Sequence, residues 1–508
     1  MIIGLFAAAV AAVVGVIQFR HGIVHLLDTV SYWSGARAVA DGHPFTSQLA
    51  PSFSNFDAVE FVTRGGRIPF VDFPVGYPLS AGLVGILIGV RPAMQLLCVL
   101  ALAAVAGATV GGARPGTRRG PLLGLAVVGA LVVTTPTMRC VTQGALSEPL
   151  FCAVALWFVV TLARFRNGAS FRPVAVLGAA LGLLRFIGAP LVLMAAWEHH
   201  RRHRDPLRAI GTMSAMLAPT ALNAVWAASS GGGHSPGWRG LQGNDIDFLV
   251  RSVGGWFDAR QGDLRRTYFS MDGTSWWSWV VAAAWVAMSV YALVGMLRGR
   301  SRLPAPAELA LVASGFITTG LVVGMMGFDA LVTPDNRLML PAGVLTLVAM
   351  AWTLADRIDS NDPRSRALVP MSALLVAIWS IASVRPWDVT ERFSDAGDPP
   401  SYVRVAAPLD VSVVVTSDAD GVHWETGIPS VYPIPSENPL TGEPVDMVSA
   451  YEQLPCALLR HDGAVVLTTD SFLAVDSGLL DSEVTAGRLT RQRTDGVDVY
   501  LPTDLACD

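Results

Sequence analysis

The chain has 508 residues, of which 52% are hydrophobic and 15% are charged, and its formal net charge is −4. Soluble domains carry about 25% charged residues, and the mean hydropathy of this chain is +0.48. Much of the chain is therefore expected to face lipid instead of water. The small net charge argues against nucleic acid as a partner.

Apolar runs recur through the first 384 residues. A helix of about 20 apolar residues crosses a bilayer, and we predict about eleven such helices. The first is interpreted as an uncleaved signal anchor, with a cleaved signal peptide as the alternative. Residues 173–198 could form one helix, but Arg185, Gly188 and Pro190 favour a turn. The predicted spans are 2–18, 93–112, 121–137, 148–163, 173–184, 186–198, 209–228, 279–297, 307–326, 338–355 and 368–384.

The arginines indicate the orientation. Short cytoplasmic loops of membrane proteins collect Lys and Arg, and a cytoplasmic N-terminus places every Arg-rich short loop inside. Residues 77–90 are apolar but too short to span, and we expect them to lie at the membrane interface. Counting them as a span would move the first two Arg clusters outside. The predicted cytoplasmic loops are 113–120, 164–172, 199–208, 298–306 and 356–367.

The chain is thus predicted to form a transmembrane domain over 1–384 and a small extracytoplasmic α/β domain over 385–508. In the latter, β-type runs such as 411–416 alternate with Asp/Gly turns. The segment Asp418-Ala-Asp420-Gly421 has the wrong spacing for a calcium loop and is interpreted as a turn. Cys456 and Cys507 could form a disulfide outside the cytoplasm. The outward loops of the transmembrane domain are 19–92, 138–147, 229–278 and 327–337.

Two acids stand at the outer membrane surface in this topology. Asp28 follows the first span and could cap the next helix, and Glu148 opens a hydrophobic helix, where the dipole favours an acid. Ionisable groups at membrane depth are nevertheless costly and usually functional. Arg185 and Arg337 are predicted at the same face. Carboxylates can deprotonate a hydroxyl and guanidinium groups match phosphate, which suits transfer chemistry on a lipid phosphate.

Four short motifs around these residues resemble the polyprenyl-phosphate-dependent glycosyltransferases of the GT-C fold, which include protein mannosyltransferases and aminoarabinose transferases. The resemblance covers about residues 1–385. The tail segment from Trp424 to Pro429 is similar to tails of actinobacterial members. The motifs are Asp28-Thr-Val-Ser-Tyr32, Phe73-Pro-Val-Gly-Tyr77-Pro78, Ser147-Glu148-Pro149-Leu-Phe151 and Asn336-Arg337-Leu-Met-Leu-Pro341.

The resemblance implies roles for individual residues. Asp28 would be the general base or orient the acceptor, and Glu148 would shape the same pocket. Arg337 would bind the donor phosphate, together with Arg185, because Phe73 stands where some relatives carry a cation. Tyr32 and Tyr77, which belong to the same motifs, are predicted to contact substrate. No organic cofactor is needed and no metal ligand is assigned, although a divalent metal is left open.

The sequence therefore predicts a multi-pass plasma-membrane hexosyl- or pentosyltransferase that uses a polyprenyl-phosphate sugar. The acceptor would be an extracytoplasmic cell-envelope glycan, lipid or protein, and the sequence identifies neither it nor the sugar. A transporter or lipid flippase is the alternative. Transporters often show internal repeats and mid-span charges, whereas this chain has no evident repeat and its charges lie at span ends. A non-catalytic scaffold would leave the two acids unexplained.

Overall fold

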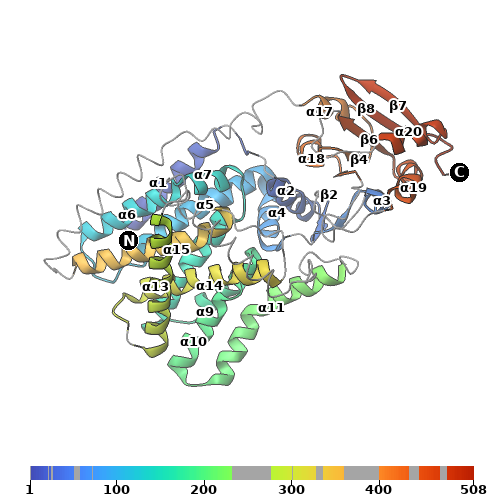
Figure 1. Ribbon diagram of the computed structural model, residues 1–508. Coiled ribbons are helices and arrows are strands. Elements are labelled where there is room, and N and C mark those ends of the chain that lie inside the picture. Colours follow the sequence, from blue (N-terminus) through green and yellow to red (C-terminus); the bar gives the residue numbers. More distant parts are fainter. Residues whose placement is uncertain are drawn as a thin grey trace. The chain divides into compact units, whose positions relative to one another are not determined.

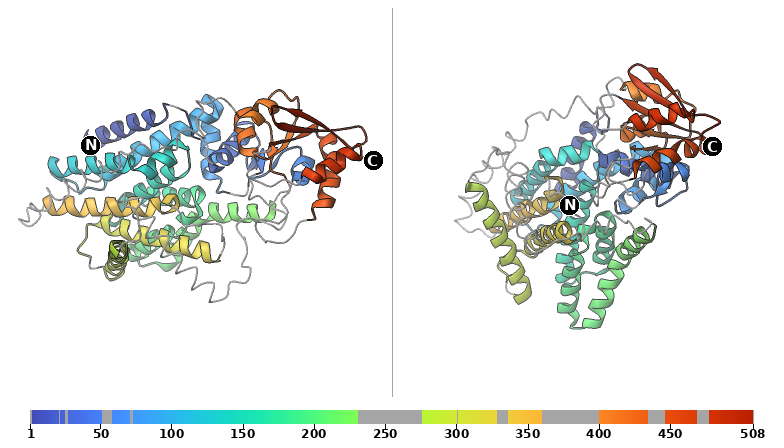
Figure 2. Two further views of the ribbon diagram at one scale, coloured as in Figure 1. Left: turned by 45° about the horizontal axis from the view of Figure 1, so that its top comes forward. Right: turned by 45° about the vertical axis from the view of Figure 1, so that its right-hand side comes forward.

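The structure is a computed structural model of the chain, shown in Figures 1 and 2. It forms two compact units, and each is described by itself. The helical unit comprises Met1–Val24, Met94–Ala224 and Gly243–Arg392, and the α/β unit comprises His25–Ala93, Val225–Gln242 and Phe393–Asp508. The residues described are 2–20, 22–24, 27–50, 58–70, 73–230, 276–299, 301–327, 336–359, 400–433, 446–468 and 477–507.

Helices account for the regular structure of the described part of the helical unit. Helix α8 lies at its centre and packs against α9, α14 and α15. Each predicted span from 2–18 to 338–355 overlaps helical residues, whereas 368–384 lies outside the described residues. The helices are α1 (Ile2–Gln18), α5 (Val90–Gly111), α6 (Arg119–Val133), α7 (Pro136–Gln143), α8 (Glu148–Arg166), α9 (Arg172–Leu184), α10 (Leu191–His203), α11 (Pro206–Ser230), α13 (Trp276–Arg298), α14 (Ala305–Gly327) and α15 (Asn336–Asp359).

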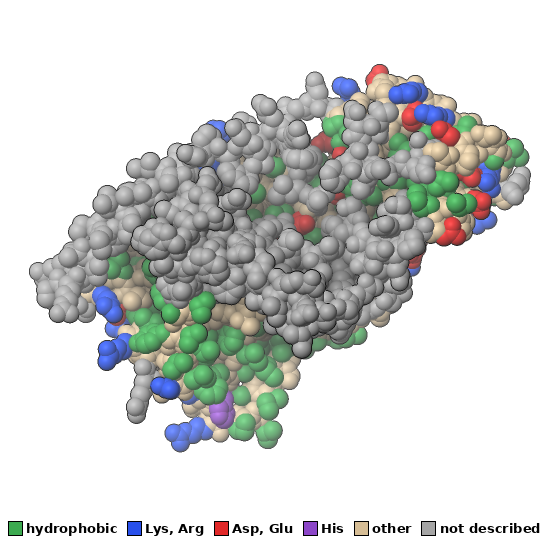
Figure 3. Space-filling view, in the orientation of Figure 1, with side chains coloured by type: hydrophobic (Ala, Val, Ile, Leu, Met, Phe, Trp, Pro, Cys, Tyr) green, Lys and Arg blue, Asp and Glu red, His purple; other side chains and the backbone are tan. Residues whose placement is uncertain are grey.

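Several of these helices are suited to a membrane. Among the described helices, three are long and apolar enough to cross one: Val90–Gly111, Glu148–Arg166 and Leu338–Asp359. A fourth would result if α6 and α7 form one broken span. Figure 3 shows hydrophobic side chains gathered over the helical unit, with basic residues at its lower end. On α11, Leu207 and Leu222 are 79% and 70% exposed, as expected for a surface that faces lipid.

Two breaks interrupt the helices. The predicted turn near Arg185 is confirmed: Arg185 is extended, with φ −154° and ψ 134°, and the short 3-10 helix Phe186–Gly188 follows it. The span predicted over 121–137 is not one straight helix, because the chain bends by 60° between α6 and α7. Pro136 forces the preceding Thr135 out of the helical conformation, and the Thr135 hydroxyl then accepts a hydrogen bond from the Met138 N–H.

A buried ion-pair network joins three helices of this unit. Arg166, at the end of α8, donates from Nη1 to Glu308 Oε2 of α14 at 2.7 Å and from Nε to Glu198 Oε2 of α10 at 3.1 Å. The side chains of Glu198 and Glu308 are 2% and 3% exposed. Buried carboxylates are tolerated only when a cation and good hydrogen bonds compensate them. The network therefore ties α8, α10 and α14 into one arrangement.

The α/β unit is built on a six-stranded mixed sheet. Its first four strands are parallel and the last two antiparallel. The segment Val413–Thr416 is buried on both faces, which explains its unbroken β-branched run. The strands in spatial order are β2 (Leu49–Ala50), β5 (Ser430–Val431), β4 (Val413–Thr416), β6 (Gly463–Thr468), β8 (Val497–Pro502) and β7 (Leu489–Thr494).

Helices cover both faces of this sheet. One face packs against α17 (Ser401–Ala406) and α18 (Ala419–Thr426). The other packs against α3 (Ala58–Thr63), α19 (Met447–Arg460) and α20 (Ser477–Thr485). The first predicted outward loop is part of this unit, because its strand β2 pairs with β5, and a small ribbon joins β1 (Thr46–Ser47) to β3 (Ile68–Pro69). The segment 393–508 is thus not a unit apart from the first loop.

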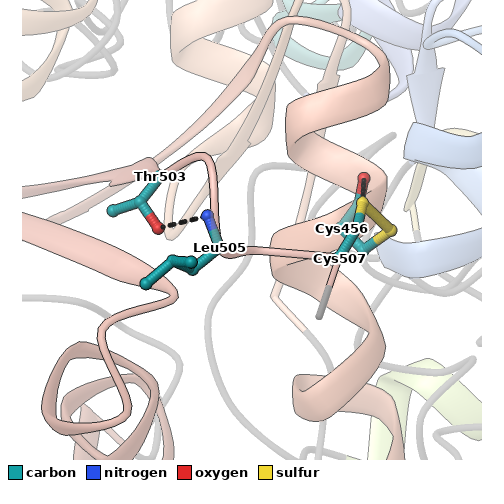
Figure 4. Close-up of a disulfide and its surroundings, with 4 residues drawn as sticks. All are labelled: Cys456, Thr503, Leu505 and Cys507. Carbon is teal, nitrogen blue, oxygen red and sulfur yellow. Dashed lines mark hydrogen bonds between the residues drawn. A yellow bond between two sulfur atoms is a disulfide. The ribbon is translucent and has the colours of Figure 1, made fainter.

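A disulfide links Cys456 of α19 to Cys507 near the end of the chain (Figure 4). The pairing that the sequence left open is therefore present. Its 51-residue separation closes a loop around β6, α20, β7 and β8. Cross-linking a loop of this size restricts the unfolded chain, and disulfides persist in oxidising compartments.

Candidate active site

Helices α2 (Leu27–Ala40) and α4 (Gly76–Ile88) of the α/β unit carry Asp28, Tyr32 and Tyr77. The two helices approach closely because Gly82 has no side chain: a Cβ there would lie 2.5 Å from the Ala36 carbonyl oxygen. The opposite side of α4 leaves Leu83, Ile86 and Leu87 exposed, at 55%, 60% and 83%. An apolar face at this spacing suits the membrane-interface position predicted for residues 77–90.

Asp28 lies in the first turn of α2 and is half-buried. It is the second residue of the helix, a first-turn position at which the helix dipole favours a carboxylate. Such an acid keeps access to solvent while its backbone is held by the helix. It can therefore accept a proton from a bound hydroxyl group.

Tyr32 and Tyr77 are brought together one turn beyond Asp28. Their ring centroids are 5.2 Å apart in an edge-on arrangement, and the Phe73 ring lies 4.9 Å from that of Tyr32. Tyr32 is 2% exposed and Tyr77 is fully buried. These rings hold α2 against the start of α4 and so fix the direction in which the first turn of α2 points.

Helix α2 also packs alongside α18 from the C-terminal part of the chain. The Trp33 ring lies 5.0 Å from the His423 ring and 5.3 Å from that of Trp424. One turn further on, Arg37 donates from Nη1 to the Gly427 carbonyl at 2.9 Å. The contacts therefore follow the same order along α2 and α18, which means that the two helices run parallel. Their first turns, with Asp28 on α2 and Asp420 on α18, lie at the same end.

Asp420 is a residue that the sequence interpretation missed. It is 4% exposed, and the Tyr432 hydroxyl donates a 2.5 Å hydrogen bond to its Oδ2. Burial raises the pKa of the Asp420 carboxyl to about 7; the charges of Asp418 and Asp28 act in the same direction, and the Tyr432 hydrogen bond opposes them. Asp28 is the smallest of the causes that raise this pKa.

The neighbours of Asp420 have structural partners. Asp418 is the N-cap of α18 and accepts from the Gly421 N–H at 2.9 Å, and it also accepts from the Tyr402 hydroxyl. Burial lowers the pKa of His423 to about 4, so its ring is neutral and its Nδ1 bonds the Ile428 carbonyl at 2.8 Å. The turn predicted at 418–421 is in fact a helix N-terminus. Its signal was an Asp two residues after the end of a buried β-strand.

Glu148 and Arg185 meet in the helical unit. Arg185 Nη1 lies 2.7 Å from Glu148 Oε1 and donates to Ser147 Oγ at 3.2 Å. Glu148, at the start of α8, is 1% exposed, and Arg185, at the break after α9, is 13% exposed. The two residues chosen from the sequence as acid and phosphate clamp therefore neutralise each other. Arg337 lies in the first turn of α15, and its side chain is outside the described part.

Metal coordination finds no support in the described residues. Within the ranges given above, no group of three or more His, Cys, Asp or Glu side chains could hold a metal ion. The acids of the α/β unit are instead bound by Tyr hydroxyls and a backbone N–H.

No protein-family model matches the chain, and neither does any curated protein. Its fold nevertheless resembles that of GT-C membrane proteins. The likeness is to the oligosaccharyltransferase AglB of Archaeoglobus fulgidus in complex with an inhibitory peptide and a dolichol-phosphate, with a TM-score of 0.50 and 10% identity over 99% of this chain and 74% of that chain.

Two further solved structures are similar at lower scores. The apo form of the A. fulgidus oligosaccharyltransferase gives a TM-score of 0.47 and 12% identity over 91% of this chain and 69% of that chain. ArnT from Cupriavidus metallidurans, bound to undecaprenyl phosphate, gives a TM-score of 0.43 and 12% identity over 99% of this chain and 98% of that chain. At such identities the likeness to AglB concerns the fold.

Proposed function

We propose that this protein is an integral membrane glycosyltransferase that moves a sugar from a polyprenyl-phosphate donor to an acceptor outside the cytoplasm. One observation carries the proposal. The fold likeness extends over 99% of the chain to an oligosaccharyltransferase solved with a lipid phosphate. The half-buried acid Asp28, held in the first turn of α2, supplies a group suited to the reaction. The sugar is a hexose or pentose, and the acceptor is a cell-envelope glycan, lipid or protein.

The proposed step is an inverting displacement at the anomeric carbon. The acceptor hydroxyl attacks that carbon and gives its proton to the Asp28 carboxylate, and a new C–O bond forms as the bond to the lipid phosphate breaks. The bonding electrons leave with the polyprenyl phosphate. Arg337 would pair with the developing phosphate charge. Arg185 remains a second candidate, although its charge is already shared with Glu148.

The same proposal covers location and orientation. The protein would lie in the plasma membrane with a cytoplasmic N-terminus and with residues 385–508 outside. The disulfide between Cys456 and Cys507 supports an oxidising surrounding for that segment. The apolar face of α4, which ends one residue before α5 begins, supports contact of the first loop with the membrane surface.

The proposal can be tested by incubating the purified protein in detergent micelles with a panel of radiolabelled polyprenyl-phosphate sugars. Micelles enclose no compartment, so transport across a membrane cannot contribute to the signal. A glycosyltransferase should move label to an acceptor from one donor class. The alternative, a flippase, would move the intact lipid between leaflets of a vesicle and leave the sugar–phosphate bond whole. Leaflet exchange without any bond cleavage would reject the proposal.

Reporter fusions test the topology. Fusions at positions 115, 203 and 360 should behave as cytoplasmic, and one at position 400 as exported, because this arrangement alone places the Arg-rich short loops inside. Paired alkaline phosphatase and green fluorescent protein reporters give opposite readings on the two sides. An exported signal at 115 would show that residues 77–90 cross the membrane.

Arg337→Lys tests the phosphate-binding role. An ammonium group keeps the charge but loses the planar fork that binds phosphate through two parallel hydrogen bonds. We expect kcat/KM for the donor to fall on the order of tenfold with little change in melting temperature. Arg357→Lys, at the other end of α15, is the matched control. If the two variants behave alike, the phosphate-binding role of Arg337 is rejected.

A further inference from the structure

The packing of α2 against α18 sets two carboxyl groups at one end of a helix pair. Trp33 contacts His423 and Trp424, and Arg37 contacts Gly427. The guanidinium of Arg91 lies 4.0 Å from the centre of the Trp424 ring and 5.5 Å from that of Trp33. Because these contacts hold α2 against α18, the first turn that carries Asp28 has a fixed position relative to the first turn that carries Asp420.

The two carboxyl groups differ in their surroundings. Asp28 is half-buried, whereas Asp420 is 4% exposed. Oδ2 of Asp420 accepts from Tyr432, and Oδ1, also buried, has no hydrogen-bond partner among the described residues. An ionised carboxylate is strongly disfavoured at such a site, but a protonated carboxyl has an O–H group to donate. The pair is therefore asymmetric, and the buried member is the one that should carry a proton.

We propose that Asp420 is a positioning residue for Asp28: it holds the single proton of the carboxyl pair, so that the negative charge stays on Asp28. This inference rests on the proposed function, in which Asp28 receives the proton of the acceptor hydroxyl. Two nearby carboxylates do not ionise independently, and the proton settles on the group that is harder to charge. The C-terminal part of the chain would thereby take part in preparing the site on α2.

The charged and titratable groups around Asp420 come from each side of α18. Asp28 and Arg37 face α18 from α2, Tyr402 from α17 and Tyr432 from the segment after β5, and Asp418 and His423 belong to α18 itself. Burial, Asp418 and Asp28 all raise the pKa of Asp420, which reaches about 7, and Tyr432 acts in the opposite direction.

The sign of the pH dependence follows from this shift. The folded protein keeps the Asp420 proton up to about pH 7, whereas the unfolded chain releases it near the ordinary value of 3.8. Between these values the native state binds more protons, so this residue's contribution to stability falls as the pH rises and is lost above about pH 7. Asp420→Asn removes this component, because an amide does not titrate.

The test is the melting temperature of the full detergent-solubilised chain across this pH window, without donor or acceptor. The wild type should lose stability as the pH rises, and Asp420→Asn should lose that slope. Asp28→Asn should move the midpoint to lower pH by a few tenths of a unit or more, because a like charge is removed. Tyr432→Phe should move it to higher pH, because a hydrogen bond to the ionised form is removed.

Asp410→Asn, an exposed acid in the same part of the chain, is the control and should leave the profile unchanged. A merely structural Asp420 would show the slope but would not respond to Asp28→Asn. An identical midpoint in the wild type and Asp28→Asn, or a slope that survives Asp420→Asn, would overturn the inference. The melting temperature does not depend on sugar transfer. A protein without transfer activity would therefore count against the proposed function but not against this inference.

Discussion

Asp28→Asn is expected to lower the transfer rate by at least about a hundredfold, because general-base catalysis is typically worth roughly 10² to 10⁴ in rate. The amide has nearly the same shape but cannot accept the proton of the acceptor hydroxyl. Its cost to the helix is small, since a first-turn carboxylate contributes only about 0.3–1 kcal/mol. The chemical loss therefore far exceeds the structural one. Initial rates at saturating donor and the melting temperature measure the two separately.

Asp41→Asn provides the matched control. Asp41 immediately follows the last residue of α2, is 51% exposed, and lies 3.8 Å from Arg37. Because exposed pairs of this kind contribute little, this variant should retain wild-type activity. If Asp28→Asn remains within a few-fold of the wild type, Asp28 is a helix-stabilising residue, and Glu148 is left as the only acid of the original pair.

Arg185→Met is expected to destabilise the protein by about 3–5 kcal/mol, because it leaves the Glu148 carboxylate buried without its cation. Glu148 is 1% exposed and its Oε1 lies 2.7 Å from Arg185 Nη1. Adding Glu148→Gln should restore much of the loss, because the buried charge is then gone as well. Equilibrium unfolding of the single and double variants gives the coupling between the two residues.

An exposed ion pair of similar length serves as the comparison. Arg114 Nη1 lies 2.8 Å from Asp356 Oδ1, but the arginine side chain is 65% exposed, and exposed pairs are worth about 0–1 kcal/mol. Arg114→Met should therefore cost far less than Arg185→Met. Equal losses would mean that burial does not govern the stability of the Glu148–Arg185 pair.

The helices of the helical unit could be predicted from sequence because each needs only a long apolar run. The break at Arg185 could also be predicted, because a charged residue is followed there by Gly188 and Pro190. The bend before α7 was missed although Pro136 marks it, because the flanking residues are apolar enough to read as one span. Hydrophobicity alone does not distinguish a straight helix from a broken one.

The composition of the α/β unit could not be predicted. Strand β2 has two residues and pairs with β5, about 380 residues later in the chain. So short a strand has no periodicity to detect. The assignment of 385–508 as a separate domain followed from a change in local composition, whereas the sheet is defined by long-range pairing.

The roles of the candidate site residues stay predictions. Asp28, Glu148 and Arg185 were selected because charges beside apolar runs stand out, but the sequence does not show that Glu148 and Arg185 bind each other. Asp420 was passed over as part of a turn. Local rules identify Asp418 as a helix cap, but the burial of Asp420 depends on α2 packing against α18, which no local pattern records.

The central claim is that a sugar–lipid-phosphate bond is broken and remade on an acceptor. The most direct measurement follows both products in one preparation: labelled sugar on the acceptor and free polyprenyl phosphate released from the donor. We expect the two products to appear in equal amounts in the wild type and to fall together in Asp28→Asn. Donor lipid recovered with its sugar intact, across all donors tried and with wild-type protein that is folded, would contradict it.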